Sequence, residues 1–282
     1  MGSTGTRSSG TSNTFMSGGS GVTAPNTNQG PLQPNVTITP ANQGNPNVQN
    51  QVPNTQNVPV TPGALTNISS MSDDELAALV LASKKAQMPN HLADYPSATQ
   101  KFVFQAGLNE KPAVLDSQAF NQFLSDNNIP QGQVMSRSVN PISYTNQSGY
   151  TTKLSGQQIN DMLKYSRLNY IGGKIGGKAY GEGAYFAMNG GGGTSYGSTS
   201  MDAVLNPKTA KIISDYNLTR QASTFAKTHP KFARAVGGFN NGTQSIYALA
   251  MGYNVISENP TKRANSGDYY CVIDRSALVI RG

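Results

Sequence analysis

The sequence predicts an α+β fold, in which a helical lobe comes first, strands gather towards the C-terminus and a disordered tail precedes both. Three observations lead to this prediction. The first 71 residues carry a single ionisable side chain, Arg7. Helix signals dominate the next part of the chain, and strand-like runs cluster after it. The expected divisions are residues 1–71 for the tail, 72–130 for the helical lobe and 131–282 for the domain that holds most of the strands.

The tail is built from Asn, Thr, Gly, Ser, Pro and Gln, and its few apolar residues are scattered. Such a segment cannot bury enough apolar area to offset a backbone entropy cost of about 1–2 kcal/mol per residue. We expect either a solvated tail or an arm that becomes ordered on a partner. In both cases the tail carries no chemistry.

The helices are predicted from capping boxes and apolar spacing. Ser72-Asp-Asp-Glu75 and Ser155-Gly-Gln-Gln158 are capping boxes, the second opening a helix through about Lys164. A third helix is expected after Asp116, where Phe120 and Phe123 stand at i and i+3. Further helices are expected at 98–106, 219–228 and 244–251.

Strands are predicted from short runs rich in β-branched and aromatic residues. They lie at Gln133–Val139, Gly183–Met188, Lys211–Ser214, Tyr253–Ser257, Tyr269–Asp274 and Ala277–Ile280. Because helices precede most of the strands, the order favours α+β over a regular βαβ array.

Composition excludes several classes of site. One Cys and two His cannot supply the usual ligands of a structural zinc ion, so no metal is expected. No apolar run approaches the roughly 18–20 residues that span a bilayer, and none follows a basic start as in a signal peptide. The net charge of +7 and the lysines of 174–178 are the only features that favour nucleic-acid binding, the least favoured class.

Two glycine-rich motifs also fail as catalytic signatures. The segment 172–178 lacks the spacing of a phosphate-binding loop. The segment 193–197 matches Gly-x-Ser-x-Gly, but no helix follows it closely, as a nucleophile elbow requires. Both are interpreted as loops.

Three separated segments form a more informative pattern. The first is Val134-Met-Ser-Arg137-Ser-Val. The second is Gly181-Glu-Gly-Ala-Tyr-Phe-Ala187, with Ser195-Tyr-Gly197 following it. The third is Ala248-Leu-Ala-Met-Gly-Tyr-Asn-Val-Ile256, followed by a loop and then by Gly267-Asp-Tyr-Tyr-Cys-Val-Ile-Asp274. In order and spacing they resemble the ADP-ribosyltransferase superfamily, especially its small bacterial and phage-encoded members, with features of the poly(ADP-ribose) polymerase branch. The resemblance covers roughly residues 130–282.

This resemblance implies a mixed split β-sheet and NAD as co-substrate. Arg137, with Ser138 beside it, would hold the nicotinamide ribose and phosphates, and Asp268 would be the catalytic acid, with Glu258 as the alternative. The implied nicotinamide pocket consists of Gly183, Tyr185, Phe186 and Tyr196. The chain departs from the family pattern in having Asp where Glu or Gln is usual, and Ala187-Met-Asn where many toxins have Ser-x-Ser/Thr.

The residue types suit this chemistry. Positive charge develops on the ribose as nicotinamide leaves, and a carboxylate beside it stabilises that state. The planar fork of an arginine donates two bonds to a pyrophosphate. Aromatic rings around the nicotinamide contribute about 0.5–1.5 kcal/mol per stacked pair. The acceptor is unknown, although Ser266 stands where arginine-modifying toxins carry a second acid, so an arginine acceptor is not favoured.

Each residue also has a structural interpretation: a surface or ion-paired Arg137, core packing for Tyr185 and Phe186, a loop aromatic for Tyr196 and a turn residue for Asp268. The functional hypothesis is therefore NAD-dependent transfer of ADP-ribose to a protein acceptor by a toxin-like effector, carried in a phage virion or acting in the host cytoplasm. The alternative is a virion assembly protein that keeps the fold without turnover and binds capsid proteins through residues 1–71.

Overall fold

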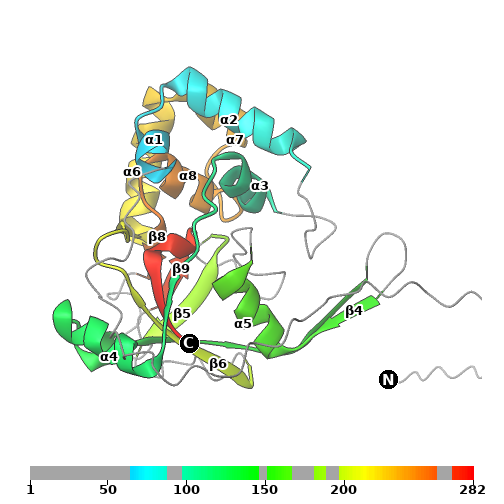
Figure 1. Cartoon of the computed structure of the whole chain (residues 1–282). Helices are drawn as coiled ribbons and strands as arrows, with labels where there is room; N and C mark the ends of the chain where they lie inside the picture. Colours follow the sequence, from blue (N-terminus) through cyan, green and yellow to red (C-terminus); the bar gives the residue numbers. More distant parts are fainter. Residues whose placement is uncertain (1–63, 88–96, 146–150, 167–180, 189–196, 259–268) are drawn as a thin grey trace, which may run out of the picture. The chain divides into compact units, whose positions relative to one another are not determined.

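An eight-stranded mixed sheet forms the centre of the protein in the computed structural model, which describes residues 64–87, 97–145, 151–166, 181–188, 197–258 and 269–282 (Figure 1). From one edge to the other the strands are β1 (Ala113–Leu115), β10 (Leu278–Arg281), β6 (Thr199–Leu205), β2 (Met135–Val139), β5 (Ala184–Met188), β9 (Tyr269–Val272), β8 (Val255–Ser257) and β7 (Ile212–Ser214). The two outermost pairs are parallel and the inner pairs are antiparallel. The α+β class and the mixed sheet are confirmed.

The middle of the sheet has a weak connection between β2 and β5. β2 pairs with β6 over five residues, from Met135 to Val139. Among the described residues, its ladder with β5 holds only two pairs, Met135 with Met188 and Ser136 with Ala187. β5 in turn pairs with β9 over four residues. The sheet therefore consists of two four-stranded halves that are joined over a short distance.

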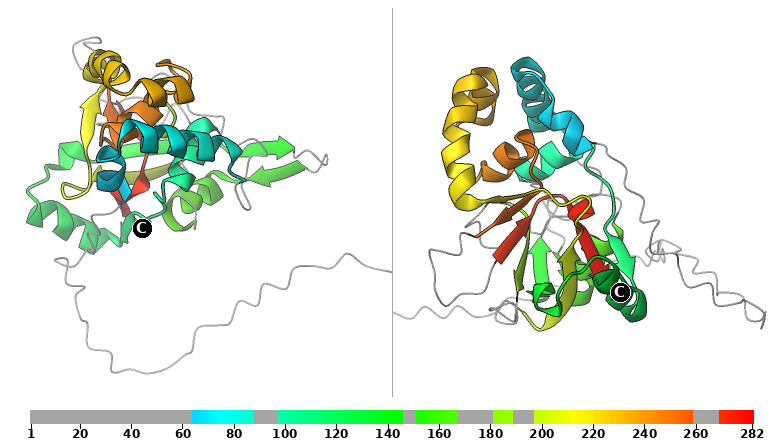
Figure 2. Two further views of the ribbon diagram at one scale, coloured as in Figure 1. Left: turned by 90° about the horizontal axis from the view of Figure 1, so that it is seen from above. Right: turned by 90° about the vertical axis from the view of Figure 1, so that its left-hand side faces the viewer.

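Helices from two distant parts of the chain, residues 64–105 and 215–250, pack together on one side of the sheet. They are α1 (Ala64–Ser69), α2 (Asp73–Lys85), α3 (Ala98–Gln105), α6 (Asp215–Thr228), α7 (Pro230–Val236) and α8 (Gln244–Ala250), seen together in Figures 1 and 2. α2 packs against α7 and α3, and α1 against α8. Their shared core includes Phe102, Phe232 and Tyr247, all fully buried.

This arrangement differs from the expected division at residue 130, because the helical layer draws half of its helices from beyond it. The start also differs: α1 begins at Ala64, before residue 72, and buries Ile68 in the helical core. A short helix of this kind is stabilised by its tertiary contacts and carries no charged cap that the sequence would reveal.

Two further helices flank the sheet. α4 (Ser117–Asp126) buries Phe120 and Phe123 against a cluster that includes Val279 on β10. α5 (Gly156–Tyr165) packs on β2 and β6. A hairpin of β3 (Ile142–Thr145) and β4 (Thr151–Leu154) runs outward from the sheet (Figures 1 and 2).

The capping signals in the sequence predicted helix starts well. The boxes at Ser72 and Ser155 form as expected, and Asp116 caps α4 through the backbone N–H of Ala119 at 2.8 Å. A further box forms at Ser97 before α3. Each satisfies N–H groups that a helix leaves without an internal partner.

Besides α1, the sequence analysis missed α7 and four strands, β1, β3, β4 and β6. β6 carries polar residues, but Asp202 accepts from Ser136 at 2.8 Å and Ser200 bonds Ser138 at 2.8 Å. These pairs across the ladder allow a polar strand to lie inside the sheet. α7 begins at Pro230 and is followed by a glycine at positive φ, which together are a usable helix signal.

Candidate functional site

The candidate site lies where the ladder between β2 and β5 ends. Arg137 is the first residue of β2 beyond the two paired positions, and its side chain is partly exposed. On the other side it pairs with Met201 of β6. The three strands that carry the sequence pattern, β2, β5 and β9, are consecutive in the sheet. A cationic side chain therefore stands at the point where the two halves of the sheet separate.

The segment before β5 is held by close packing. Ser245 on α8 bonds both backbone groups of Glu182: it accepts from the N–H at 2.7 Å and donates to the carbonyl at 2.9 Å. A Cβ on Gly183 would lie 2.5 Å from Cys271 Sγ and 2.7 Å from the Val272 carbonyl oxygen. Glycine is therefore required at 183 for contact with β9.

The other predicted pocket residues on β2 and β5 have structural roles. The Tyr185 hydroxyl donates to the Gly181 carbonyl at 2.6 Å, and the ring packs against the helical core. Phe186 is 1% exposed and belongs to the cluster on the other face, with Met135 and Leu163. Ser138 is buried and bonds Ser200. Tyr185 and Phe186 therefore contact different cores.

The two candidate catalytic acids, Asp268 and Glu258, stand next to strands β9 and β8 in the sequence. Asp268 and Tyr196 lie outside the described residues, Asp268 immediately before Tyr269, the first residue of β9. Glu258 follows β8, is buried, and its N–H donates to the Tyr269 carbonyl at 2.9 Å. β8 is three strands from β2, about 14 Å at the usual strand spacing.

Arg137 and Glu182, an acid to which the sequence analysis assigned no role, both affect the pKa of the Cys271 thiol on β9. Burial raises the pKa of the Cys271 thiol to about 12. A hydrogen bond with Tyr185 lowers this pKa, the Glu182 carboxylate raises it, and Arg137 lowers it. Charges of both signs, Glu182 and Arg137, therefore act on the same position of β9. The thiol itself stays neutral near pH 7 and is not a nucleophile.

A buried amide lies on the α5 side of β2 and β6. Asn160 is 1% exposed and donates to the Thr199 carbonyl at 3.5 Å. Its Oδ1 has no hydrogen-bond partner within the described part of the chain. An acceptor left without a partner costs about 1–3 kcal/mol, so this atom would gain from a polar ligand or a water molecule. The sequence shows Asn160 only as one polar residue in an amphipathic helix.

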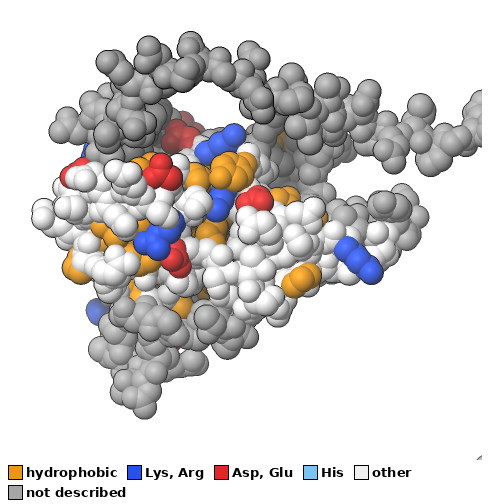
Figure 3. Space-filling view, turned by 60° about the horizontal axis from the view of Figure 1, so that its bottom comes forward, with side chains coloured by type: hydrophobic (Ala, Val, Ile, Leu, Met, Phe, Trp, Pro, Cys, Tyr) orange, Lys and Arg blue, Asp and Glu red, His pale blue; other side chains and the backbone are white. Residues whose placement is uncertain are grey.

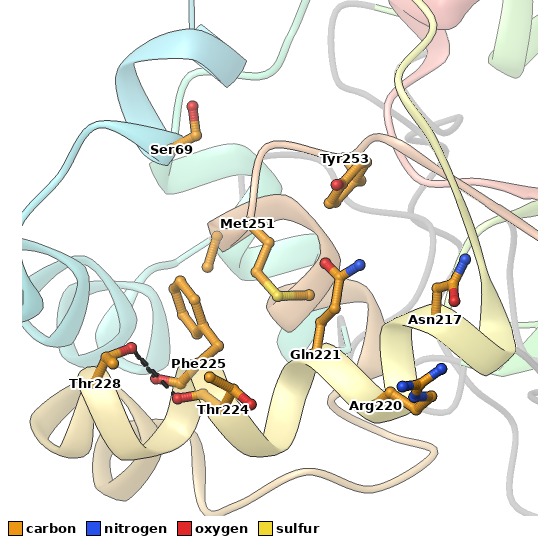
Figure 4. Close-up of a pocket in the computed structure, with 10 residues that line it drawn as sticks. Ser69, Asn217, Arg220, Gln221, Thr224, Phe225, Thr228, Met251 and Tyr253 are labelled. Atoms are coloured by element: carbon orange, nitrogen blue, oxygen red, sulfur yellow. Dashed lines mark hydrogen bonds between the residues drawn. The ribbon is translucent and has the colours of Figure 1, made fainter.

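A separate groove of about 670 Å³ lies in the helical layer (Figure 4). Its walls are α6, the end of α8 with the turn that follows it, and Ser69 of α1. Asn217, Arg220, Gln221 and Thr224 of α6 line the groove together with Met251 and Tyr253, and Gln221 points towards these two residues. The uncharged polar residues at helical spacing on α6 are a sequence pattern that could have indicated this polar groove wall.

Charged side chains of both signs lie on the described surface. Figure 3 shows basic and acidic side chains interspersed on one face, without a patch of one sign. The described residues contain no group of three His, Cys, Asp or Glu side chains placed to hold a metal ion. No helix among them has both the length and the apolar character to cross a membrane.

Comparison with protein-family models, with curated proteins and with solved structures finds no match for this chain.

Proposed function

We propose that the protein transfers ADP-ribose from NAD to a side chain of a protein acceptor. The observation that carries the proposal is the adjacency of β2, β5 and β9, with the ladder between β2 and β5 ending at Arg137. The proposal is supported because Arg137 belongs to β2, next to β5 and one strand from β9, the strands in which the sequence resembles the transferase pattern. Arg137 would bind the pyrophosphate through paired, charge-assisted hydrogen bonds.

In the proposed reaction the bond between ribose C1′ and the nicotinamide nitrogen breaks, and nicotinamide leaves as a neutral molecule with the bonding electrons. The acceptor atom then bonds C1′ and releases its proton to a carboxylate. Asp268, directly before β9, is the proposed carboxylate and Glu258 the alternative. A negative charge next to C1′ stabilises the positive charge that develops there.

A second candidate function is a non-catalytic assembly protein. It is favoured by the structural roles of Ser138, Tyr185 and Phe186, which bond or pack within the protein. Under this hypothesis Arg137 stabilises the fold, and the chain binds neither NAD nor nicotinamide.

The test measures NAD binding by calorimetry, and nicotinamide release and labelled transfer in a host-cell lysate. We expect activity from the full chain, a raised KM or loss of NAD binding in Arg137→Ala, and loss of turnover with retained NAD binding in Asp268→Ala. Arg234→Ala is the matched control, because Arg234 is an exposed arginine on α7. Loss in Glu258→Ala but not in Asp268→Ala would move the acid to Glu258. Absence of both NAD binding and label would reject the transferase and favour the assembly protein.

A further inference from the structure

The groove beside α6 has polar walls over an apolar floor. Asn217, Gln221, Thr224 and Thr228 stand at i, i+4, i+7 and i+11 of α6 and form one stripe along the groove. Phe225, Ala250 and Met251 supply apolar contacts between them and the opposite wall. Figure 4 shows Gln221 directed towards Met251 and Tyr253. The groove therefore offers hydrogen bonds and apolar contact along the same line.

Several of these polar groups have no partner among the residues that the structure describes. Within the described residues, the side chains of Asn217, Gln221 and Tyr253 make no hydrogen bond to another protein group. Thr228, at the end of the same stripe, differs: its hydroxyl donates to the Phe225 carbonyl at 3.1 Å. The amides are therefore exposed to solvent and can bond a ligand without breaking a contact of the fold.

The spacing of the two amides matches an extended peptide. Residues one helical turn apart lie about 5–6 Å from each other, close to the roughly 6.6 Å between alternate residues of an extended chain. A carboxamide carries both a donor and an acceptor, so it can bond the N–H and C=O of a peptide backbone together. The stripe from Asn217 to Thr228 is about 16 Å long, which corresponds to about five extended residues.

Charge indicates which peptide fits. Arg220 is the only charged side chain among the described residues that line the groove. It is exposed and stacks over the Tyr216 ring at 5.5 Å, and it forms no ion pair with a described carboxylate. A guanidinium supported on a ring leaves its fork open to a carboxylate. The chain as a whole carries a net charge of +7, which would also attract an acidic partner.

We propose that this groove binds an extended peptide segment of a partner protein, with its backbone on Asn217 and Gln221 and an acidic side chain on Arg220. The groove is formed by the helical layer and does not involve β2, β5 or β9. The proposal is therefore independent of NAD chemistry.

The probe is a library of random 12-residue peptides, selected on the immobilised full-length chain, followed by fluorescence anisotropy with the selected peptides. We expect one enriched Asp or Glu position. Gln221→Ala should weaken binding about tenfold, the effect of losing one well-placed backbone contact. Arg220→Gln should abolish the preference for an acidic over a neutral residue while retaining weaker binding.

Lys227→Gln is the matched control, since Lys227 is an exposed cation on the same helix outside the groove. It should leave the affinity unchanged. Selection of no peptide, a preference for basic residues, or binding equal in wild type and Gln221→Ala would overturn the proposal. Equal melting temperatures of all four proteins would show that the differences come from the groove.

Discussion

The turn around Arg275 and the groove beside α6 both gather arginine, amide and hydroxyl groups, but they use them in opposite ways. Arg275 is fully buried, and its guanidinium donates to the carbonyls of Asn109, Glu110, Met162, Leu163 and Ser166 at 2.6–3.5 Å. Arg220 is exposed and contacts one ring. The comparison shows that polar residues of the same types hold the fold in one region and remain open to a ligand in the other.

The physical reason is burial. The Arg275 side chain is fully buried, and its guanidinium satisfies carbonyls at the end of α5 that the helix leaves without an internal donor. Burial lowers the pKa of Arg275 to about 10, while Asp274 raises it. The side chain is therefore still charged at neutral pH. On α6 the guanidinium and amide groups face solvent, so removing one of them should change the free energy of unfolding little.

The largest expected effect is on stability, from Arg275→Met. The substitution keeps much of the side-chain volume but removes the donor from five backbone carbonyls, which we expect to lower the free energy of unfolding by about 3–5 kcal/mol. Urea unfolding followed by circular dichroism measures this loss. A loss below about 1 kcal/mol would mean that water replaces the guanidinium and that the turn is not closed to solvent.

Gly183→Ala should give the next largest effect. Its Cβ would meet Cys271 Sγ at 2.5 Å and the Val272 carbonyl oxygen at 2.7 Å, so β5 and β9 must move apart, at a cost of about 2–4 kcal/mol. Gly237→Ala is the control, because that glycine has φ 97° but no atom near its Cβ position. There we expect only the backbone strain of about 1–2 kcal/mol. Equal losses in both variants would contradict tight packing at Gly183.

The pH dependence of stability should report on Asp274, which is next to Arg275. Burial raises the pKa of Asp274 from its ordinary value of 3.8, while bonds to Ser276 and Asn254 and the charge of Arg275 lower it. The pKa of Asp274 is therefore higher in the folded protein than in the unfolded chain. At pH values between the two, the folded state keeps a proton that the unfolded chain has released. The free energy of unfolding should therefore fall as pH rises through this window, by up to about 1.4 kcal/mol per pH unit.

Asp274→Asn should remove most of that slope. Burial followed by the charge of Asp274 also raises the pKa of Glu110, so a smaller slope of the same sign should remain in the variant. Urea titrations of both proteins at several pH values measure the difference. Identical pH profiles would show that Asp274 is ionised in both states over this range.

The smallest expected effect is on stability from Arg220→Met, the counterpart of Arg275→Met. Because the guanidinium is exposed and makes one ring contact, the free energy of unfolding should change by no more than about 0.5 kcal/mol. The same urea experiment measures it. A loss comparable to that of Arg275→Met would remove the distinction between the two regions.

Local sequence signals predicted most of the helices because their caps are local. Ser72, Ser155 and Asp116 each bond groups within three residues, so the pattern and the contact lie in the same stretch of chain. The N-terminal cap of α7 shows the limit of such signals, although Pro230 and the glycine after the helix are local. Its first N–H groups are capped by Asp73 of α2, which accepts from Lys231 at 3.0 Å and from Phe232 at 2.8 Å. No local pattern contains a cap contributed by a residue 158 positions away in the sequence.

In the candidate site, too, some features could be predicted from the sequence and others depend on tertiary contacts. The sequence indicated Arg137 and the strands around it, and the structure sets those strands side by side. It did not indicate that Tyr185 bonds Gly181, that Ser138 bonds Ser200, or that Gly183 is required by Cys271. These contacts depend on register between strands, which only the assembled sheet specifies.

By itself the sequence determined the α+β class, the capped helices and the position of Arg137 on a strand, because each follows from residues close together in the chain. Tertiary structure decided which helices share a layer, where the ladder between β2 and β5 ends, and which polar groups lose contact with water. The reason is that burial and strand pairing bring distant residues together, and their energies depend on neighbours that no local pattern specifies.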